Sequence, residues 1–540
     1  MAKRFATSCF IVLGVCIFLI SCLSLVMFLA PGFSVFGIKY IAKNTHVINK
    51  KYKIVEELGD FSGSIIVDCH ELPVYVYFTE EWDYRIEYYD NYNGLTTSKF
   101  DDPKVTLKRT ADGSAMVSIS EYRRFLYESS SSERYLKIFI PLTSVYGEIV
   151  GGVPQQGGSA YKTNLNIYSE TSQINFSKIV EADPRTPRFN LVTLETNGSV
   201  SYSTHVQAKT FKYSTDSSIV ITKSNKSSVD AENYVLNSRK GKIQITRPVA
   251  GDINATTDLG DITLVSCKNL VAKANYGSVH SSGNSRVDIA GIVNITTKAG
   301  NVYLGEVSGN GENKIKTGSG EVGINKILNG SIVTTRGPIE IKSVNNMKIE
   351  TNVGRVEIEE VLTAVDISST RGNVYLGGED MLINNPTVFA KLGRVFVKAA
   401  SGTVDIRTME GNVEFKNTNS ENITIYSGGK LKATNLKGLV NIDSAKDVNL
   451  QFESINNNVT IVLRKTCKKA KIEALNNAYD EIRYLLLGKW VTRYGDNGAG
   501  SFTIREASDT LNTSTMGSGP LLKITGKSAN ISLYMQNETI

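Results

Sequence analysis

The sequence predicts an all-β protein whose main body is a parallel β-solenoid (β-helix) with an antiparallel β cap, preceded by one N-terminal transmembrane helix. Three observations predict this fold. A motif of the form Gly-x-(Val/Ile)-x-apolar returns at nearly constant intervals, short segments that alternate apolar and polar residues surround it, and one long uncharged run lies near the N-terminus. Alternation with period two is typical of strands with one buried face.

The uncharged run is long enough to cross a bilayer. No charged residue occurs between Phe5 and Ile38, and the densest part, Phe10–Ala30, would span about 30 Å as a helix. Pro31 then breaks the helix. We therefore expect three N-terminal segments: a short tail at 1–9, a transmembrane helix at 10–30 that inserts into the lipid bilayer, and a juxtamembrane linker at 31–50.

Two other fates of this run stay open. The stretch Leu19-Ile20-Ser21-Cys22 resembles a lipobox, in which Cys22 would become a lipidated N-terminus, and a secretory signal peptide would be removed altogether. Both are disfavoured because the apolar run continues well past Cys22, whereas a cleaved signal usually holds only ~7–15 apolar residues. We favour an uncleaved signal anchor.

Residues 51–145 predict the cap. They are rich in aromatic and charged residues, and the stretches LPVYVYFTEEWDYRIEYYD, KVTLKRTADGSAMVSISEYRR and RYLKIFIPL alternate apolar and polar positions. The sequences YNG and ADG supply turn signals between these stretches. We expect an antiparallel β-rich N-terminal cap over one end of the solenoid.

The repeat defines the solenoid, which we expect to cover residues 146–464. Several successive motif glycines lie 17 to 21 residues apart, and a short strand precedes many of them. A propeller blade needs a period near 40 or more, and a sandwich would not keep one motif in phase for so long. The motif begins at Gly260, Gly277, Gly300, Gly320, Gly337, Gly354, Gly372, Gly393, Gly402, Gly411 and Gly438.

Stacking of the coils explains why the repeat folds. One coil cannot bury its apolar face alone, whereas coils ~4.8 Å apart bury a continuous core. Each buried aliphatic side chain contributes roughly 1.5–3 kcal/mol, which exceeds the ~0.5–1 kcal/mol that a glycine costs; we expect the glycines to serve turns with positive φ. The two expected ladders are Ile339, Val356, Val374 and Val395, and then Ile341, Ile358, Leu376 and Val397.

The ends of the solenoid are less regular. Residues 146–250 have the pattern of irregular early coils, with GSVSYS and GKIQIT as their motifs. Residues 465–540 lose the period and end in an alternating stretch, LLKITGKSANISLYM. Terminal repeats of solenoids are usually atypical because they protect an open edge, so we expect a C-terminal β cap at 465–540.

A family resemblance accompanies these patterns. The strand pair GSIIVDCHELPVYVYF, the stretch YLKIFIPL (Tyr135–Leu142), the GxVxI coils and the final strand LLKITGKSANISLYM are similar to those of a bacterial domain-of-unknown-function family labelled "putative adhesin". The resemblance runs from about Ile54 to the C-terminus, and it implies a β-solenoid that is often attached to a membrane. It brings no catalytic residues. The long segment 146–250 departs from compact members of the family, as an insertion would.

Orientation in the membrane is predicted in two opposing ways. Lys3 and Arg4 precede the apolar run, whereas five lysines between residues 39 and 53 follow it, and this count alone places the C-terminal side in the cytoplasm. The family resemblance implies instead a single-pass protein of the cell membrane with a large extracellular domain. We favour the extracellular domain.

The sequence assigns no catalytic, cofactor-binding or metal-binding residue. A net charge of +7 with scattered lysines is mild for 540 residues and argues against nucleic-acid binding. The cysteines Cys69, Cys267 and Cys467 are isolated, which is typical of small buried residues, and His70 is interpreted as a surface strand residue. The stretch GSGEVG (318–323) matches a dinucleotide motif but keeps the phase of a strand.

Two outward features remain as candidates. Glu340 and Glu357 occupy equivalent places, and stacked coils would set them ~5 Å apart, the separation that retaining glycosidases use. No third acid or base follows in phase, so we favour two solvated glutamates. The outward aromatics Tyr303, Tyr375 and Phe396 suggest a contact surface for sugars or proteins, or else ordinary packing between strands.

Together these features predict a membrane-anchored cell-surface β-solenoid with an adhesin-like or envelope-structural binding role and no catalysis. Beyond the bilayer, the expected partners are surface glycans or proteins. One alternative is an envelope stress or signalling component that binds a regulatory partner. A second is a polysaccharide-active β-helix enzyme, which would require acidic residues clustered in one pocket across coils.

Overall fold

The computed structural model describes most of the chain, and the described part is all-β apart from short helices at 12–22, α2 (Ile54–Leu58) and α3 (Leu142–Tyr146). The described residues are 12–22, 34–35, 38–39, 44–59, 62–81, 83–94, 104–120, 128–146, 149–150, 153–154, 163–171, 173–178, 186–222, 228–281, 286–477, 482–494, 502–505 and 519–535.

The expected membrane span is covered only in part. Residues 12–22 form a helix with exposed apolar side chains, while the rest of 10–30 and the whole of the tail at 1–9 lie outside the described residues. Among the helices that the structure describes, none is both long enough and apolar enough to cross a membrane. The transmembrane helix therefore stays a prediction. Strand β3 already begins at Asn44, within the segment expected as a linker.

The chain forms two compact units. We call residues 1–217 with 221–236 the N-terminal unit, and residues 218–220 with 237–540 the C-terminal unit. The strands up to residue 238 are β1 (Ser34–Val35), β2 (Ile38–Lys39), β3 (Asn44–Lys53), β4 (Ile65–Asp68), β5 (Val74–Thr79), β6 (Arg85–Gly94), β7 (Lys104–Arg109), β8 (Ala115–Ser120), β9 (Glu128–Pro141), β10 (Ile149–Val150), β11 (Val153–Pro154), β12 (Asn164–Tyr168), β13 (Ile174–Lys178), β14 (Arg188–Glu195), β15 (Val200–Tyr202), β16 (Val206–Thr215), β17 (Ile219–Ile221) and β18 (Val229–Ser238).

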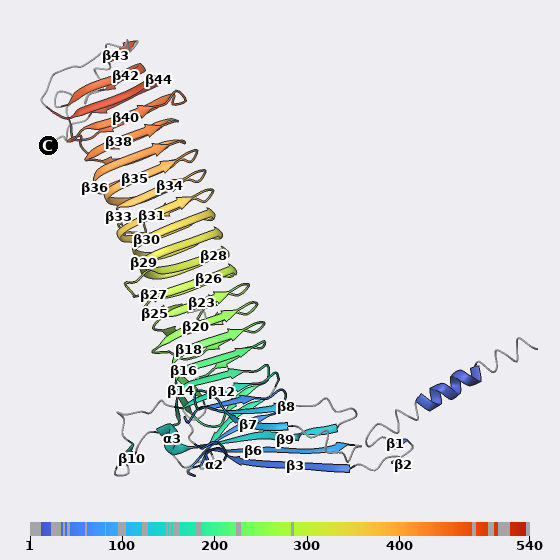
Figure 1. The fold of residues 1–540 in the computed structure, drawn as a ribbon. Coiled ribbons are helices and arrows are strands. Elements are labelled where there is room, and N and C mark those ends of the chain that lie inside the picture. The colour runs from blue at the N-terminus through green and yellow to red at the C-terminus, as the bar shows by residue number, and fades with distance from the viewer. Residues whose placement is uncertain are drawn as a thin grey trace, which may run out of the picture. The chain divides into compact units, whose positions relative to one another are not determined.

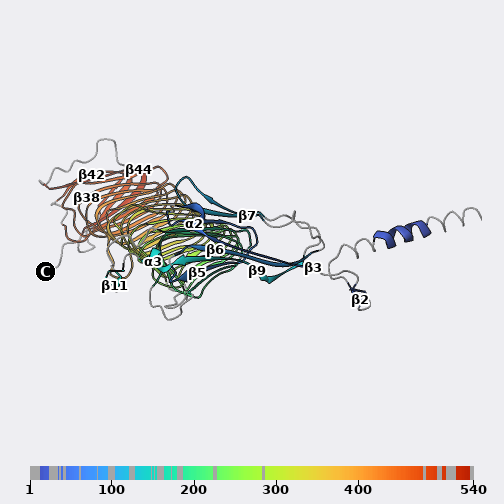
Figure 2. The same cartoon turned by 60° about the horizontal axis from the view of Figure 1, so that its bottom comes forward.

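A six-stranded sheet organises the N-terminal unit, with the strand order β15-β13-β5-β9-β6-β3. Figure 2 shows β3, β6, β9 and β5 of this sheet side by side. Strand β6 runs antiparallel to both β3 and β9, whereas β5 runs parallel to β9 and to β13. The expected antiparallel cap is therefore only partly right. Alternation of apolar and polar residues reveals that a segment is a strand but carries no information about strand direction.

The C-terminal unit is a β-solenoid, whose strands stack in Figure 1 from green through yellow to red. Its strands are β19 (Ile243–Ile245), β20 (Asp252–Thr257), β21 (Ile262–Thr263), β22 (Ser266–Cys267), β23 (Leu270–Ala274), β24 (Val279–His280), β25 (Val287–Ile289), β26 (Val293–Ala299), β27 (Val302–Val307), β28 (Asn313–Ser319), β29 (Val322–Arg336), β30 (Ile339–Val353), β31 (Val356–Ser369), β32 (Val374–Leu376), β33 (Ile383–Asn384), β34 (Pro386–Ala390), β35 (Val395–Thr408), β36 (Val413–Ser427), β37 (Leu431–Leu436), β38 (Leu439–Ser444), β39 (Val448–Phe452), β40 (Val459–Leu463), β41 (Lys469–Ala474), β42 (Arg483–Tyr494), β43 (Phe502–Arg505) and β44 (Leu521–Met535).

The expected inward ladders are confirmed. In the first, Ile339 pairs with Val356, Val356 with Val374 and Val374 with Val395, all in parallel register and all at most 1% exposed. The second ladder pairs in the same three steps. The first ladder is one part of a buried column that runs through Ile243, Ile262, Val279, Val302, Val322, Ile339, Val356, Val374, Val395, Val413, Leu431, Val448, Ala470, Ile531 and Val491.

The repeat glycines have a role that the sequence did not predict. They stack on one another, and a Cβ on Gly354, Gly372 or Gly393 would overlap with the carbonyl oxygen of the glycine one coil below. Within this glycine column, which runs from Gly260 to Gly429, a positive φ occurs only at Gly337. The expectation of positive-φ turns is therefore wrong for most of these glycines. The small residue is needed because adjacent backbones approach too closely for a side chain.

The column continues past residue 464, although the sequence loses its period there. Strand β44 pairs in parallel with β40 and β41 on one side and with β42 on the other, and β43 runs antiparallel to β42. The last described strand of the chain therefore lies between two earlier ones. Because the order of the coils no longer follows the order of the sequence, equal spacing along the chain is lost while the stacking continues.

Candidate functional site

The candidate site lies on the outward side of the coils that carry the first ladder. The fourth residue of each Gly-x-Val-x-Ile motif lies between two buried neighbours and therefore points away from the interior. We call this set the outer column. Its members pair coil by coil in the order Tyr303, Gly323, Glu340, Glu357, Tyr375, Phe396, Glu414, Lys432 and Asn449.

A second outward set follows the column glycines and fixes the backbone beside the outer column. Asn373 Oδ1 accepts a hydrogen bond from the backbone N–H of Arg394 at 2.9 Å, and Asn412 Oδ1 accepts one from Lys430 at the same distance. Asp447 Oδ1 accepts the backbone N–H groups of Lys468 and Lys469, each at 3.0 Å. These bonds tie each coil to the next, so the side chains around them are presented on a rigid frame.

Between these two sets lies an open groove of about 440 Å³. Its polar and aromatic lining comes from five successive coils, and the buried ladder residues form its floor. We call it the column groove. The side chains that give it its chemistry are those of Tyr375, Arg394, Phe396, Glu414, Lys430, Lys432 and Asp447.

The structure brings two of the three expected aromatics together. The rings of Tyr375 and Phe396 lie 6.4 Å apart between centroids, tilted by 46°, and both side chains are half-buried. The guanidinium of Arg355 lies 5.2 Å from the centre of the Tyr375 ring, within the range of a cation–π contact. Tyr303 lies several coils away in the outer column and donates a hydrogen bond to Glu321 at 3.1 Å. Burial and then this hydrogen bond raise the pKa of Tyr303.

Charged side chains in the groove fall into two groups. Lys432 Nζ forms an ion pair with Glu414 at 3.1 Å, so these two charges offset each other. Arg394 and Lys430 are exposed, and neither forms an ion pair with any residue that the structure describes. The groove thus presents two cations whose charges are not offset by a direct ion pair, next to an aromatic pair.

The expected stacking of Glu340 on Glu357 is confirmed, because the two residues are direct partners in the β30–β31 ladder. Glu357 forms an ion pair with Arg355, whereas Glu340 is exposed. Their neighbours in the outer column are Gly323 and Tyr375, which provide no third acid or base. This arrangement supports solvated glutamates more than an acid–nucleophile pair.

The cysteines match their expected role as buried residues, whereas His70 lies on the surface as expected but just after β4 and not in a strand. His70 is exposed and its Nδ1 lies 3.2 Å from Glu170 Oε1, while Cys69 beside it is buried. Burial raises the pKa of Cys267 to about 12 and that of Cys467 to about 11, which keeps both thiols protonated near neutral pH. Within the described ranges no cluster of His, Cys, Asp or Glu could hold a metal ion. The stretch 318–323 lies in β28 and β29 and opens no helix.

A second surface was not identified from the sequence. On the six-stranded sheet of the N-terminal unit, alternate residues of β5, β6 and β9 place aromatic rings on one face. We call this the tyrosine face. It comprises Tyr75, Tyr77, Tyr89, Tyr135 and Phe139, linked by ring contacts of 5.1 to 6.3 Å.

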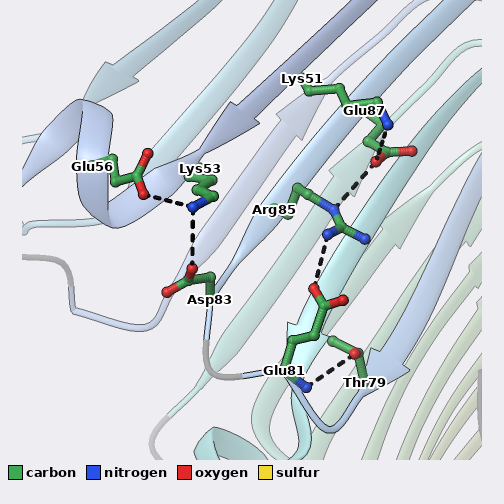
Figure 3. Close-up of polar contacts among 8 residues, drawn as sticks. All are labelled: Lys51, Lys53, Glu56, Thr79, Glu81, Asp83, Arg85 and Glu87. Carbon is green, nitrogen blue, oxygen red and sulfur yellow. Dashed lines mark hydrogen bonds and ion pairs between the residues drawn. The ribbon is translucent and has the colours of Figure 1, made fainter.

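Cations on the tyrosine face are engaged by rings and acids. Lys137 lies 4.5 Å from the centre of the Tyr135 ring, and Arg85 lies 4.3 Å from that of Phe139. Figure 3 shows Arg85 between Glu81 and Glu87, at 2.8 and 3.2 Å. In the same view Lys51 pairs with Glu87 at 3.3 Å, and Lys53 pairs with both Glu56 and Asp83. The alternation in LPVYVYF could have indicated this face, but the pairing of β5 with β9 could not be read from it.

Comparison with known proteins identifies the family that part of the chain resembles. Residues 63–269 match the family model described as Toastrack DUF4097. The resemblance to a bacterial family of unknown function is thereby confirmed for this segment. The Toastrack match begins at the quoted strand pair and contains YLKIFIPL, but it ends before most of the regular coils and before the final strand. The segment 146–250, which the sequence pattern suggested as an insertion, lies entirely within the Toastrack match.

The chain was also compared with solved structures and with curated proteins. A solved structure described as a "putative adhesin" from Bacteroides fragilis is 14% identical, with 57% of this chain and 96% of that chain covered and a TM-score of 0.17. At that TM-score the likeness carries no argument about shape or role. No curated protein matches the chain.

Proposed function

We propose that the protein is a membrane-anchored β-solenoid of the cell surface that binds surface glycans or proteins through its outer column and carries out no catalysis. The observation that carries the proposal is the column groove. There, aromatic and charged side chains from successive coils stand at a fixed spacing on a frame tied by backbone and side-chain hydrogen bonds. A rigid, repetitive and open surface suits an extended ligand better than a small substrate, which usually requires an enclosed pocket.

The lining of the groove supports glycans over other ligands in this proposal. Half-buried rings at Tyr375 and Phe396 offer apolar surface to the face of a sugar, and the neighbouring charged groups can hydrogen-bond to its hydroxyls. The carboxylate pair Glu340 and Glu357 lies outside the groove lining, and Glu357 is engaged by Arg355. This supports a binding role more than hydrolysis.

Binding can be tested with the full chain in detergent against immobilised neutral and acidic surface polysaccharides. We expect retention that Phe396→Ala reduces at least about tenfold, since loss of a buried aromatic contact is worth more than 1 kcal/mol. Tyr303→Ala is the matched control, because it removes a ring from the same outer column outside the groove. Retention that is absent, or equally reduced by both variants, would contradict the proposed role of the groove.

Anchoring can be tested separately in cells. Because residues 10–30 are uncharged and long enough to span a bilayer, we expect the protein to stay with the membrane during alkaline extraction. We also expect protease added to intact cells to remove the solenoid. Release by alkali would contradict the anchor, and full protection in cells without an outer barrier would place the large domain in the cytoplasm.

A further inference from the structure

We infer that the column groove is built for an acidic polysaccharide, with Arg394 and Lys430 binding carboxylates of the polymer and Phe396 stacking on a sugar beside Arg394. The inference rests on the proposed binding function and narrows its ligand to one chemical class. It commits to uronic-acid-type polymers, in which carboxylates recur along an extended chain.

The positions of the two cations support a repeating anion. Arg394 and Lys430 follow the column glycines Gly393 and Gly429, and the coil that begins at Gly411 separates them. With coils ~4.8 Å apart, two steps place their backbones about 10 Å apart along the solenoid axis. A polymer lying along that axis meets Arg394 and Phe396 on one coil and Lys430 two coils further on.

The charge balance of the groove favours an anionic partner. Lys432 and Glu414 are paired with each other, and Asp447 accepts two backbone N–H groups. The cations left without an ion pair among the described residues are Arg394 and Lys430. A guanidinium binds a carboxylate through two parallel N–H donors, and such charge-assisted bonds are about twice as strong as neutral ones.

The backbone around the groove disfavours a peptide as the ligand. Extended peptides commonly bind by adding a strand to a free sheet edge, or by placing an apolar helix face in an apolar groove. Strand β35 is paired with β32 and β34 on one side and with β36 on the other, so this part of the sheet has no free edge. The side chains that stand out into the groove are aromatic, polar and charged, while the aliphatic ladder residues form only its buried floor.

The aromatic pair completes the site. Tyr375 and Phe396 are tilted by 46° instead of stacked face to face, and both are half-buried rather than fully covered. Arg355 holds the Tyr375 ring from the side of the preceding coil. Phe396 lies on the same coil as Arg394, two residues away, so a sugar on its ring would have a cation beside it.

The experiment uses the full chain in detergent with two forms of one polymer, polygalacturonate and its fully methyl-esterified form. The ester keeps the sugar rings and removes the negative charge. We expect polygalacturonate to bind at least about tenfold more tightly than the ester, and Arg394→Ala and Lys430→Ala each to reduce its binding at least about tenfold. Lys391→Ala is the matched control: it removes an exposed cation of the solenoid that lies outside the groove lining, so binding should change less than about threefold.

The outcomes separate this inference from the proposed function. If the ester binds as tightly as the acid, and Phe396→Ala weakens both, the acidic class is wrong while a glycan-binding groove stands. If neither polymer nor any other surface polysaccharide binds, the proposed function fails as well. If polyglutamate binds as tightly as polygalacturonate and responds to the same variants, the groove selects charge on a peptide and the polysaccharide assignment is overturned.

Discussion

The tyrosine face and the column groove use the same kinds of residue in opposite ways. On the tyrosine face, Arg85 is placed between two carboxylates and over a ring, so its charge is used inside the protein. In the column groove, Arg394 stands beside a ring without an ion pair among the described residues. Aromatic and basic residues alone therefore do not mark a binding surface; the pairing of the cations distinguishes a sheet that stabilises itself from one that offers charge to a partner.

The largest expected effect is a loss of stability that is confined to the unit carrying the column groove and spares the unit carrying the tyrosine face. Val356 is fully buried in the ladder beneath the outer column, so Val356→Asp places a charge in a dry stack. We expect a loss of at least about 4 kcal/mol in the stability of the C-terminal unit. Hydrogen exchange of β31 amides measures it, while β5 and β9 in the tyrosine face should keep their protection.

The control for this variant is Lys342→Asp on the neighbouring coil. Lys342 is exposed, so the same new side chain there meets solvent and should change stability by less than about 1 kcal/mol. Equal losses of stability in the two variants would mean that a negative charge destabilises the coil wherever it is placed. Val356 would then not lie in a dry interior.

A smaller loss is expected from the glycine column that supports the groove. In Gly372→Ala the new methyl group overlaps with the carbonyl of Gly354, and the coils must shift apart. We expect a cost of about 1–3 kcal/mol, measured by thermal unfolding. Gly378→Ala is the matched control, since a Cβ there meets only side-chain atoms at 3.2 Å or more and φ is not in the left-handed region. A harmless Gly372→Ala would show that the coils are not held in close contact.

The contrast between the two surfaces also shows how far the sequence could lead. The ladder from Ile339 to Val395 was predictable, because each residue holds the same place in a repeated motif. The parallel pairing of β5 with β9 was not, since alternation does not encode direction or partner. The role of Gly372 was missed because spacing along the chain does not separate a positive φ from a close approach between backbones.

For the candidate site, the sequence pointed to its aromatic residues but not to its chemistry. Tyr375 and Phe396 could be placed on one outward column by counting from the motif glycines. That Arg394 remains unpaired while Lys432 is paired depends on the side-chain geometry of adjacent coils. Past residue 464 the sequence failed for another reason: β44 lies between β41 and β42, so stacking order and chain order differ.

A smaller expected effect on stability tests whether Arg85 and Arg394 differ in their ion pairing. Arg85→Ala removes two ion pairs and a cation–π contact, and we expect it to lower the stability of the N-terminal unit by about 1 kcal/mol. Arg394→Ala removes no ion pair among the described residues and should change stability by less than about 0.5 kcal/mol. Thermal unfolding of both variants measures the difference. If Arg394→Ala proves as costly as Arg85→Ala, its charge is used inside the protein and the groove has no free cation there.

The smallest expected effect is a difference between the units in alkali. Burial raises the pKa of Cys267 in the C-terminal unit from its ordinary value of 9.0 to about 12, and burial followed by the charge of Asp90 raises that of Tyr88 in the N-terminal unit above its ordinary 10.0. A group whose pKa is higher in the folded than in the unfolded protein contributes its full stabilisation of the fold below its unfolded pKa. That contribution is lost as the pH rises from the unfolded pKa to the folded pKa. The contribution of Cys267 to the C-terminal unit should therefore begin to fall near pH 9.0, and that of Tyr88 to the N-terminal unit only near pH 10.0.

Thermal unfolding between about pH 8 and 11 tests this order. In Cys267→Ala the alkaline loss of the C-terminal unit should become shallower, because alanine has no proton to lose as the pH rises. Cys22→Ala removes an exposed thiol and should leave the slope unchanged. If Cys267→Ala keeps the full slope, the buried thiol does not set the alkaline limit of the solenoid, and the two units differ in their pairing of cations but not in their response to base.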